Sequence, residues 1–258
     1  MTHSGAPQQA PVNPPLMCYD PTVMSSLFSY DNAEFDEYAA EYDAALQRGL
    51  SVSGEDKYYF ARGRVAWLAR RLRKMGERPR SLMDFGCGTG SATPYLFELL
   101  DAASVTGVDI SERSLEAARR AFGSDRARFL QFAEHEPAEK IDLVFSNGVF
   151  HHIPPGDRAQ AIDYVYRSLK RGGLFALWEN NPWNPGTRLV MSRVPFDRDA
   201  IMLSALEAGR LLRSGGFRVL RADFLFIFPR PLKWFRPLEP LVSRLPLGAQ
   251  YQVICRKP

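Results

Sequence analysis

Between residues 81 and 179, short apolar runs alternate with amphipathic segments. Apolar runs of five to seven residues are typical of strands buried on both faces, and the amphipathic segments are typical of crossover helices. This alternation predicts a parallel sheet that is covered by helices on both faces. The predicted strands are 81–86, 104–110, 127–132, 141–147 and 173–179, and the predicted helices between them are 91–100, 111–122 and 156–173.

The C-terminal part of the chain departs from this alternation. Segments 217–228 and 249–257 have strand composition, and the proline-punctuated stretch 229–248 between them has no helix pattern strong enough for a crossover. The simplest arrangement is an antiparallel pair that closes the sheet. The predicted fold class is therefore α/β: a Rossmann-like, seven-stranded, mostly parallel sheet with an antiparallel last strand.

The N-terminal part has a different composition. Residues 1–16 are rich in Pro, Gln and Ala, which predicts a disordered tail. Apolar residues then recur at helical spacing in 32–49 and 54–76, and Pro79 marks a break before the first strand. We therefore expect a helical lid over 17–78 and the main domain over 79–258.

Bulk composition limits the classes of protein. The chain has 258 residues and 33 Lys plus Arg against 29 Asp plus Glu, a mild positive charge that does not require a nucleic-acid partner. Its three cysteines, Cys18, Cys87 and Cys255, form no C-x-x-C pair and no zinc spacing, so we expect reduced thiols, no metal site and a cytoplasmic location. Neither a signal peptide nor an apolar run of about 20 residues is present, which predicts a soluble protein.

A glycine-rich turn follows the first predicted strand, in the sequence "MDFGCGTG". A tight βα turn without a ligand would explain the glycines alone. However, Asp84 precedes them, and a carboxylate there would repel a pyrophosphate but attract an ammonium group. Asp109 ends the next strand, where an acid can accept both hydroxyls of a ribose. No G-x-x-x-x-G-K-[ST] loop is present. A ligand with a ribose and a cationic amino-acid end, such as S-adenosylmethionine, meets these requirements.

The stretches "MDFGCGTG", "VTGVDIS" and "IDLVFSNGVFHHI" resemble the class I S-adenosylmethionine-dependent methyltransferases over about Ser81–Glu179. The resemblance implies a methionine-side wall, a clamp for ribose and adenine, and S-adenosylmethionine as the cofactor. Phe132 stands where the family often has an acid, so Ala133 or Glu134 would supply the polar contact to adenine. The cofactor-binding residues implied are Asp84, Phe85, Gly86, Cys87, Gly88, Asp109, Ile110, Phe132, Ala133, Asn147 and Gly148, and Arg62 is a candidate partner of the cofactor carboxylate.

Methyl transfer needs a base only when the acceptor keeps its proton until attack. His151 and His152 follow the fourth predicted strand and are candidate bases, although this pair can equally fix the loop. Glu179 is a further catalytic candidate after the fifth strand. Predicted acceptor-binding residues are Asn180, Asn181 and Trp183, with Tyr30, Tyr38 and Tyr42 from the lid; a proline-rich loop and plain helix packing are the competing explanations.

The sequence therefore predicts a methyltransferase for a small-molecule acceptor: a secondary metabolite, a sugar or a lipid-like intermediate. Methylation of RNA or protein is an alternative, and a non-catalytic S-adenosylmethionine-binding protein is a second one. No dense basic stripe or added nucleic-acid-binding domain is present, so no nucleic-acid partner is expected. Peripheral membrane contact through 228–248 competes with ordinary packing of that segment. The protein is expected to be a monomer or a homodimer.

Overall fold

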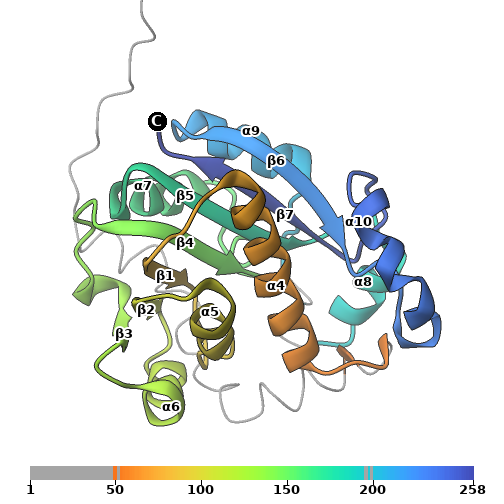
Figure 1. The fold of residues 1–258 in the computed structure, drawn as a ribbon, viewed down its shortest axis with the longest axis horizontal. Coiled ribbons are helices and arrows are strands. Elements are labelled where there is room, and N and C mark those ends of the chain that lie inside the picture. The colour runs from red at the N-terminus through yellow and green to blue at the C-terminus, as the bar shows by residue number, and fades with distance from the viewer. Residues whose placement is uncertain (1–48, 51–52, 195–196, 198–199) are drawn as a thin grey trace, which may run out of the picture.

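One seven-stranded sheet of order β3-β2-β1-β4-β5-β7-β6 forms the centre of the molecule (Figure 1). A computed structural model describes residues 49–50, 53–194, 197 and 200–258. Strands β1 to β5 pair in parallel, and β7 runs antiparallel to both β5 and β6. The predicted fold class is confirmed. The strands are β1 (Ser81–Phe85), β2 (Ser104–Asp109), β3 (Ala127–Gln131), β4 (Ile141–Asn147), β5 (Leu169–Asn180), β6 (Arg218–Leu225) and β7 (Gln250–Arg256).

Helices cover both faces of this sheet (Figure 1). The described helices are α4 (Lys57–Met75), α5 (Thr93–Leu100), α6 (Glu112–Phe122), α7 (Arg158–Ser168), α8 (Pro185–Met191), α9 (Ala205–Ser214) and α10 (Glu239–Val242), with 3-10 turns η2 (Phe132–Glu134) and η4 (Arg230–Leu238). Helices α4 and α5 pack on one face, and α7 and α9 pack on the other. Helix α6 packs against β2 and β3.

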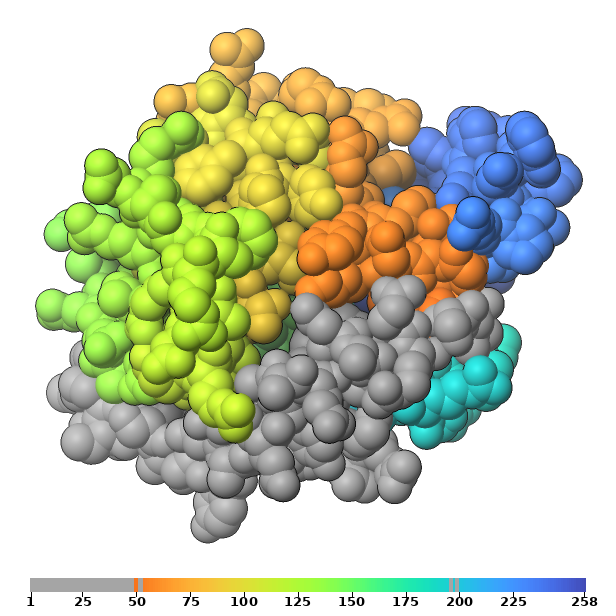
Figure 2. Space-filling model, turned by 90° about the horizontal axis from the view of Figure 1, so that it is seen from below, coloured from red at the N-terminus to blue at the C-terminus, as the bar shows by residue number. Residues whose placement is uncertain are grey.

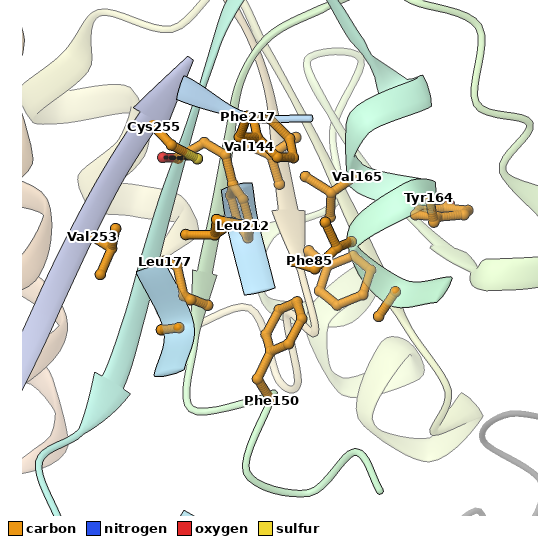
Figure 3. Packing of buried hydrophobic residues seen from close by; sticks show 14 of the residues in the cluster. Phe85, Val144, Phe150, Tyr164, Val165, Leu177, Leu212, Phe217, Val253 and Cys255 are labelled. Atoms are coloured by element: carbon orange, nitrogen blue, oxygen red, sulfur yellow. Dashed lines mark hydrogen bonds between the residues drawn. The ribbon is translucent and has the colours of Figure 1, made fainter. Parts of the chain in front are cut away.

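The core under α7 and α9 is dense in aromatic side chains (Figure 3). Phe85 from β1 stacks on Phe150 with ring centroids 5.8 Å apart, and Phe175 from β5 contacts Phe217 at 5.9 Å. Cys255 lies among them, where burial raises the pKa of its thiol well above the usual value. This packing fixes the ends of β1 and β4, which carry the candidate site.

Helix α4 is the described part of the predicted lid. Asp56 caps its first turn by accepting from the Tyr59 N–H, and Gly76 ends it with a left-handed φ of 73°. Its Val65 and Leu68 are fully buried against the sheet. Helix α4, together with α5, therefore covers one face of the sheet. The rest of the predicted lid up to residue 48, and the predicted tail over 1–16, lie outside the described residues.

Two local predictions need correction. The expected helix over 156–173 ends at Ser168, and β5 begins at Leu169 instead of residue 173. The segment after β5 contains α8 and α9, which the sequence analysis did not predict. Among the described residues, no helix is long and apolar enough to cross a membrane.

Candidate active site

A pocket opens at the carboxyl ends of β1, β2 and β4. The parallel register brings these ends to one edge, with Phe85 beside Val108 and beside Ser146. This is the edge at which open α/β sheets bind ligands. The pocket is lined by Gly86, Gly88, Thr89, Asp109, Ile110, Ser111, Ser114, Phe132, Asn147, Gly148, Val149, His152 and Ile153.

The glycine turn gives the pocket a wall of bare backbone. Gly86 has a φ of 71°, and a Cβ there would lie 2.2 Å from Cγ2 of Val149. Gly88 has a φ of 51°, but a Cβ there would meet nothing within 4 Å, because the position faces open space. The turn is fixed to β2, since the Gly86 N–H donates to the Val108 carbonyl at 2.8 Å. A ligand can therefore lie directly against the backbone at Gly88.

Two carboxylates lie next to this wall: Asp109 lines the pocket, and Asp84 does not. Asp109 accepts from the Gly88 N–H at 2.7 Å and from the Ser111 N–H at 3.0 Å. Asp84 is 3% exposed, and burial together with the negative charge of Asp109 raises the pKa of its carboxyl to about 7. A cation bound beside Asp84 would relieve both effects.

Glu179 organises the turn that follows β4. This buried carboxylate accepts from the Val149 N–H at 3.0 Å and the Phe150 N–H at 2.7 Å. Its other oxygen lies 2.6 Å from Nδ1 of His151. Glu179 does not line the pocket. It positions the turn that does, and its predicted catalytic role stays a prediction.

The two histidines have different surroundings. His151 is 3% exposed; burial opposes its charge, but Glu179 and Asp197 outweigh that effect and raise the pKa of the imidazole to about 10. His152 lines the pocket, and burial together with the charge of His151 lowers its pKa. Nε2 of His152 lies 3.3 Å from Oδ1 of Asp197, and Nε2 of His151 lies 3.4 Å from the same oxygen. These surroundings favour the charged form of His151 and the neutral form of His152.

Asp197 completes this cluster. Burial opposes its charge, but hydrogen bonds from both histidines lower the pKa of its carboxyl to about 2. His151, His152 and Asp197 also offer donor atoms within 4.8 Å of one another, a group that could hold a metal ion. The sequence analysis expected no metal site and did not foresee this group.

The other predicted residues fall into three sets. The first set lines the pocket: Gly86, Gly88, Asp109, Ile110, Phe132, Asn147, Gly148 and His152. Phe85 and Cys87 are buried behind it, and Ala133 is exposed outside it. Tyr30, Tyr38 and Tyr42 lie outside the described residues.

Arg62 and the loop after β5 lie apart from the pocket walls. Arg62 forms an exposed ion pair with Glu98 of α5 at 3.3 Å. Asn180 accepts from Gln250, and Asn181 donates to the carbonyls of Pro246 and Gly248 at 3.0 and 2.8 Å. Trp183 is 52% exposed. In this structure Arg62, Asn180 and Asn181 make structural contacts, and none of the four residues reaches the described pocket.

Five wall residues were not predicted from the sequence: Thr89, Ser111, Ser114, Val149 and Ile153. Ser111 was readable, because a serine directly before a predicted helix is a typical N-cap, and its Oγ accepts from the Ser114 N–H at 3.1 Å. Val149 and Ile153 carried no signal besides their position after the fourth strand.

Comparisons with known proteins agree with this geometry. Residues 83–175 match the family described as "Methyltransferase domain". The trans-aconitate 2-methyltransferase of Azoarcus sp. strain BH72 is 30% identical over 115 residues, 45% of each chain. The enzyme of that name from Rhodopseudomonas palustris strain BisB18 is 27% identical over 169 residues, 66% of this chain and 60% of its own. The chain thus spans less than two thirds of the length of these relatives.

Solved structures show the same fold. The S-adenosylmethionine-dependent methyltransferase from Thermotoga maritima superposes with a TM-score of 0.57 at 21% identity, over 87% of this chain and 98% of that one. The one from Mesorhizobium loti gives 0.53 at 18% identity, over 74% and 97%. The matched segment is a methyltransferase domain, and its fold is that of S-adenosylmethionine-dependent methyltransferases. The resemblance stated from the sequence is confirmed.

The pocket of this methyltransferase domain fits its cofactor. Asp84 is a buried carboxylate with a raised pKa, suited to an ammonium group. Oδ1 of Asn147 is buried without a hydrogen-bond partner among the described residues, and Asn147 lines the same pocket. The methionine end of S-adenosylmethionine offers a cation for the first and N–H donors for the second.

Proposed function

We propose that the protein transfers a methyl group from S-adenosylmethionine to a hydroxyl group of a small molecule, with His152 as the general base. His152 carries the proposal, because it lines the pocket as a neutral imidazole held by Asp197. A neutral imidazole that lines a pocket can take a proton from an acceptor bound there. Hydroxyl acceptors lose a proton on methylation and therefore benefit from such a base.

The bound cofactor supplies a methyl group activated by a sulfonium. The chain's own residues then have three tasks. Asp84 holds the cationic amino-acid end, and Asp109, which lines the pocket, faces the ribose hydroxyls. The turn over 147–152, fixed by Glu179, sets the place of His152 relative to the methyl group. Alignment by such fixed groups is the main way a protein accelerates an in-line displacement.

The names of the relatives support a small-molecule acceptor, since trans-aconitate is one. Trans-aconitate, however, is an anion, and no Lys or Arg lines the described pocket. A carboxylate acceptor normally meets a cationic partner and needs no base. We therefore propose a neutral hydroxyl acceptor for this chain.

Formation of S-adenosylhomocysteine with panels of hydroxylated and carboxylated acceptors tests the proposal. We expect turnover with hydroxylated compounds, and a loss of about 10²–10³-fold in kcat for His152→Gln with unchanged affinity for S-adenosylhomocysteine. The acidic limb of the kcat profile should disappear in this variant. Full turnover by His152→Gln, or turnover confined to carboxylates, would contradict the proposal.

A further inference from the structure

The segment 229–248, called here the C-terminal arm, exposes large apolar side chains. Of the twelve large hydrophobic residues that are exposed in the described part of the chain, seven belong to this arm, so their exposure is a local property. They are Leu232, Trp234, Phe235, Leu238, Leu241, Leu245 and Leu247, with Trp234 80% and Leu241 79% exposed. In Figure 2 the arm is part of the blue projection on the right. Exposed apolar side chains concentrated in one segment are typical of an interaction site.

The basic and acidic side chains of the arm are exposed to different extents. Arg230, Lys233 and Arg244 are exposed. The single acid, Glu239, is turned inward and accepts from the Ile227 and Phe228 N–H groups at 3.0 and 3.1 Å. Only cations therefore face outward beside the apolar side chains.

The fold holds the arm in place through backbone hydrogen bonds. The Phe224 N–H of β6 donates to the Ser243 carbonyl at 2.7 Å. Asn184 donates to the Leu247 carbonyl at 2.8 Å, and Asn181 donates to the Gly248 carbonyl at 2.8 Å. These bonds anchor the polar backbone of the arm, while its apolar side chains remain outside the core. The same asparagines belong to the loop that follows β5, so the arm is joined to the carboxyl edge of the sheet.

We propose that the C-terminal arm docks on the surface of an anionic lipid bilayer. Trp234 and Leu241 insert at the level of the headgroups, and Arg230, Lys233 and Arg244 contact lipid phosphates. Apolar burial and attraction to anionic lipid together give this kind of interfacial binding. A twofold contact between two copies through this surface would bring the cations of one arm near those of the other, and such like-charge contacts oppose association.

Flotation of the full-length protein with vesicles tests the proposal. The probes are vesicles of phosphatidylcholine alone and vesicles of phosphatidylcholine with phosphatidylglycerol. We expect binding to the anionic vesicles, and weaker binding as salt screens the charges. Trp234→Ser combined with Leu241→Ser should lower the partition at least tenfold, and Lys233→Gln with Arg244→Gln should lower it by about fivefold for each cation removed.

Leu206→Ser on α9 is the matched control, because Leu206 is 62% exposed but lies outside the arm. This variant should bind vesicles like the wild type. Failure of the wild type to bind anionic vesicles would overturn the proposal, as would equal losses in the control and the arm variants. Light scattering that shows a dimer dissociated by the Trp234 and Leu241 substitutions would also overturn it, because a second copy would then be the occupant.

Discussion

Two buried carboxylates, Asp84 and Asp223, lie on different strands of one sheet and have opposite surroundings. Asp223 of β6 is 1% exposed and accepts from Nε of Arg71 at 2.8 Å, from Trp67 at 3.2 Å and from Arg221 at 2.6 Å. Asp84 of β1 is 3% exposed, and the charge that acts on it is that of another acid, Asp109. Asp223 is paired with a cation, and Asp84 has no cationic partner among the residues that the structure describes.

This difference separates a structural group from a binding group. A buried charge that is paired and hydrogen-bonded is part of the fold, and its partners explain it. A buried acid whose pKa is raised to about 7 destabilises the ligand-free fold. A bound cation can offset this destabilisation. Asp84 therefore indicates a ligand, and Asp223 indicates how β6 is tied to α4.

The largest effect is expected from Asp223→Ala. This change leaves the Arg71 guanidinium buried without its carboxylate, and breaking such a pair typically costs about 3–5 kcal/mol. Urea unfolding should show this loss, while calorimetry with S-adenosylhomocysteine on the folded fraction should show unchanged affinity. A large loss of affinity would remove the distinction between the two acids.

The pH dependence of the ligand-free wild type should reveal Asp84. Its carboxyl binds a proton more tightly in the folded state, so stability falls as pH rises from about 4 to about 7. Over this pH range the free energy of unfolding should fall by about 4 kcal/mol. Urea unfolding at several pH values measures it, and the Asp84→Asn variant should have a flatter profile. Parallel profiles for the two proteins would refute the assignment.

A smaller effect is expected from Glu179→Gln, which keeps the shape but removes the charge beside His151. We expect a loss of about 2 kcal/mol at pH 7, since a hydrogen bond to a charged group contributes about that much. The pKa of His151 is raised in the folded state. The interaction of charged His151 with Glu179 therefore stabilises the fold below about pH 6.5, and this stabilisation is lost as pH rises through about 10. The variant and the wild type should therefore converge in stability above pH 10, and a constant difference would contradict this reasoning.

The smallest stability effect is expected from Gly88→Ala. The new Cβ meets no atom within 4 Å, so only the left-handed φ of 51° costs energy, about 1–2 kcal/mol. The methyl group projects into the pocket and should weaken S-adenosylhomocysteine binding at least tenfold.

Gly76→Ala is the matched control for Gly88→Ala. Gly76 has a φ of 73° and also has no atom within 4 Å of an added Cβ, but it ends α4 away from the pocket. Calorimetry should show wild-type affinity for this variant. Equal losses of affinity in the two variants would mean that backbone strain, and not the pocket wall, determines binding.

Much of the fold was predictable because it depends on local patterns. The five parallel strands could be recognised as short apolar runs. Asp84 and Asp109 could be recognised as acids at the ends of strands. Helix α9 was missed although Ser204 and Glu207 form a capping box, a signal that the sequence does contain. The boundary at Leu169 was missed because the helix pattern runs on through a charged stretch.

The site was less predictable where it depends on long-range contacts. Asp197 reaches His151 and His152 across more than forty residues, and no spacing rule connects them. Glu179 was found as a polar residue at a strand end, but its role follows from three donors on a different loop. Asn181 has its partners in the C-terminal arm, and no local pattern in the sequence shows these contacts.

The most direct test of the central claim is a paired measurement on Asp84→Asn. The amide removes the buried charge, so the ligand-free protein at pH 8 should unfold with a free energy up to about 4 kcal/mol higher than the wild type. Calorimetry should show affinity for S-adenosylhomocysteine lowered at least 100-fold, because the ammonium group loses its counter-charge. A variant that is less stable than the wild type and binds S-adenosylhomocysteine with unchanged affinity would contradict the account.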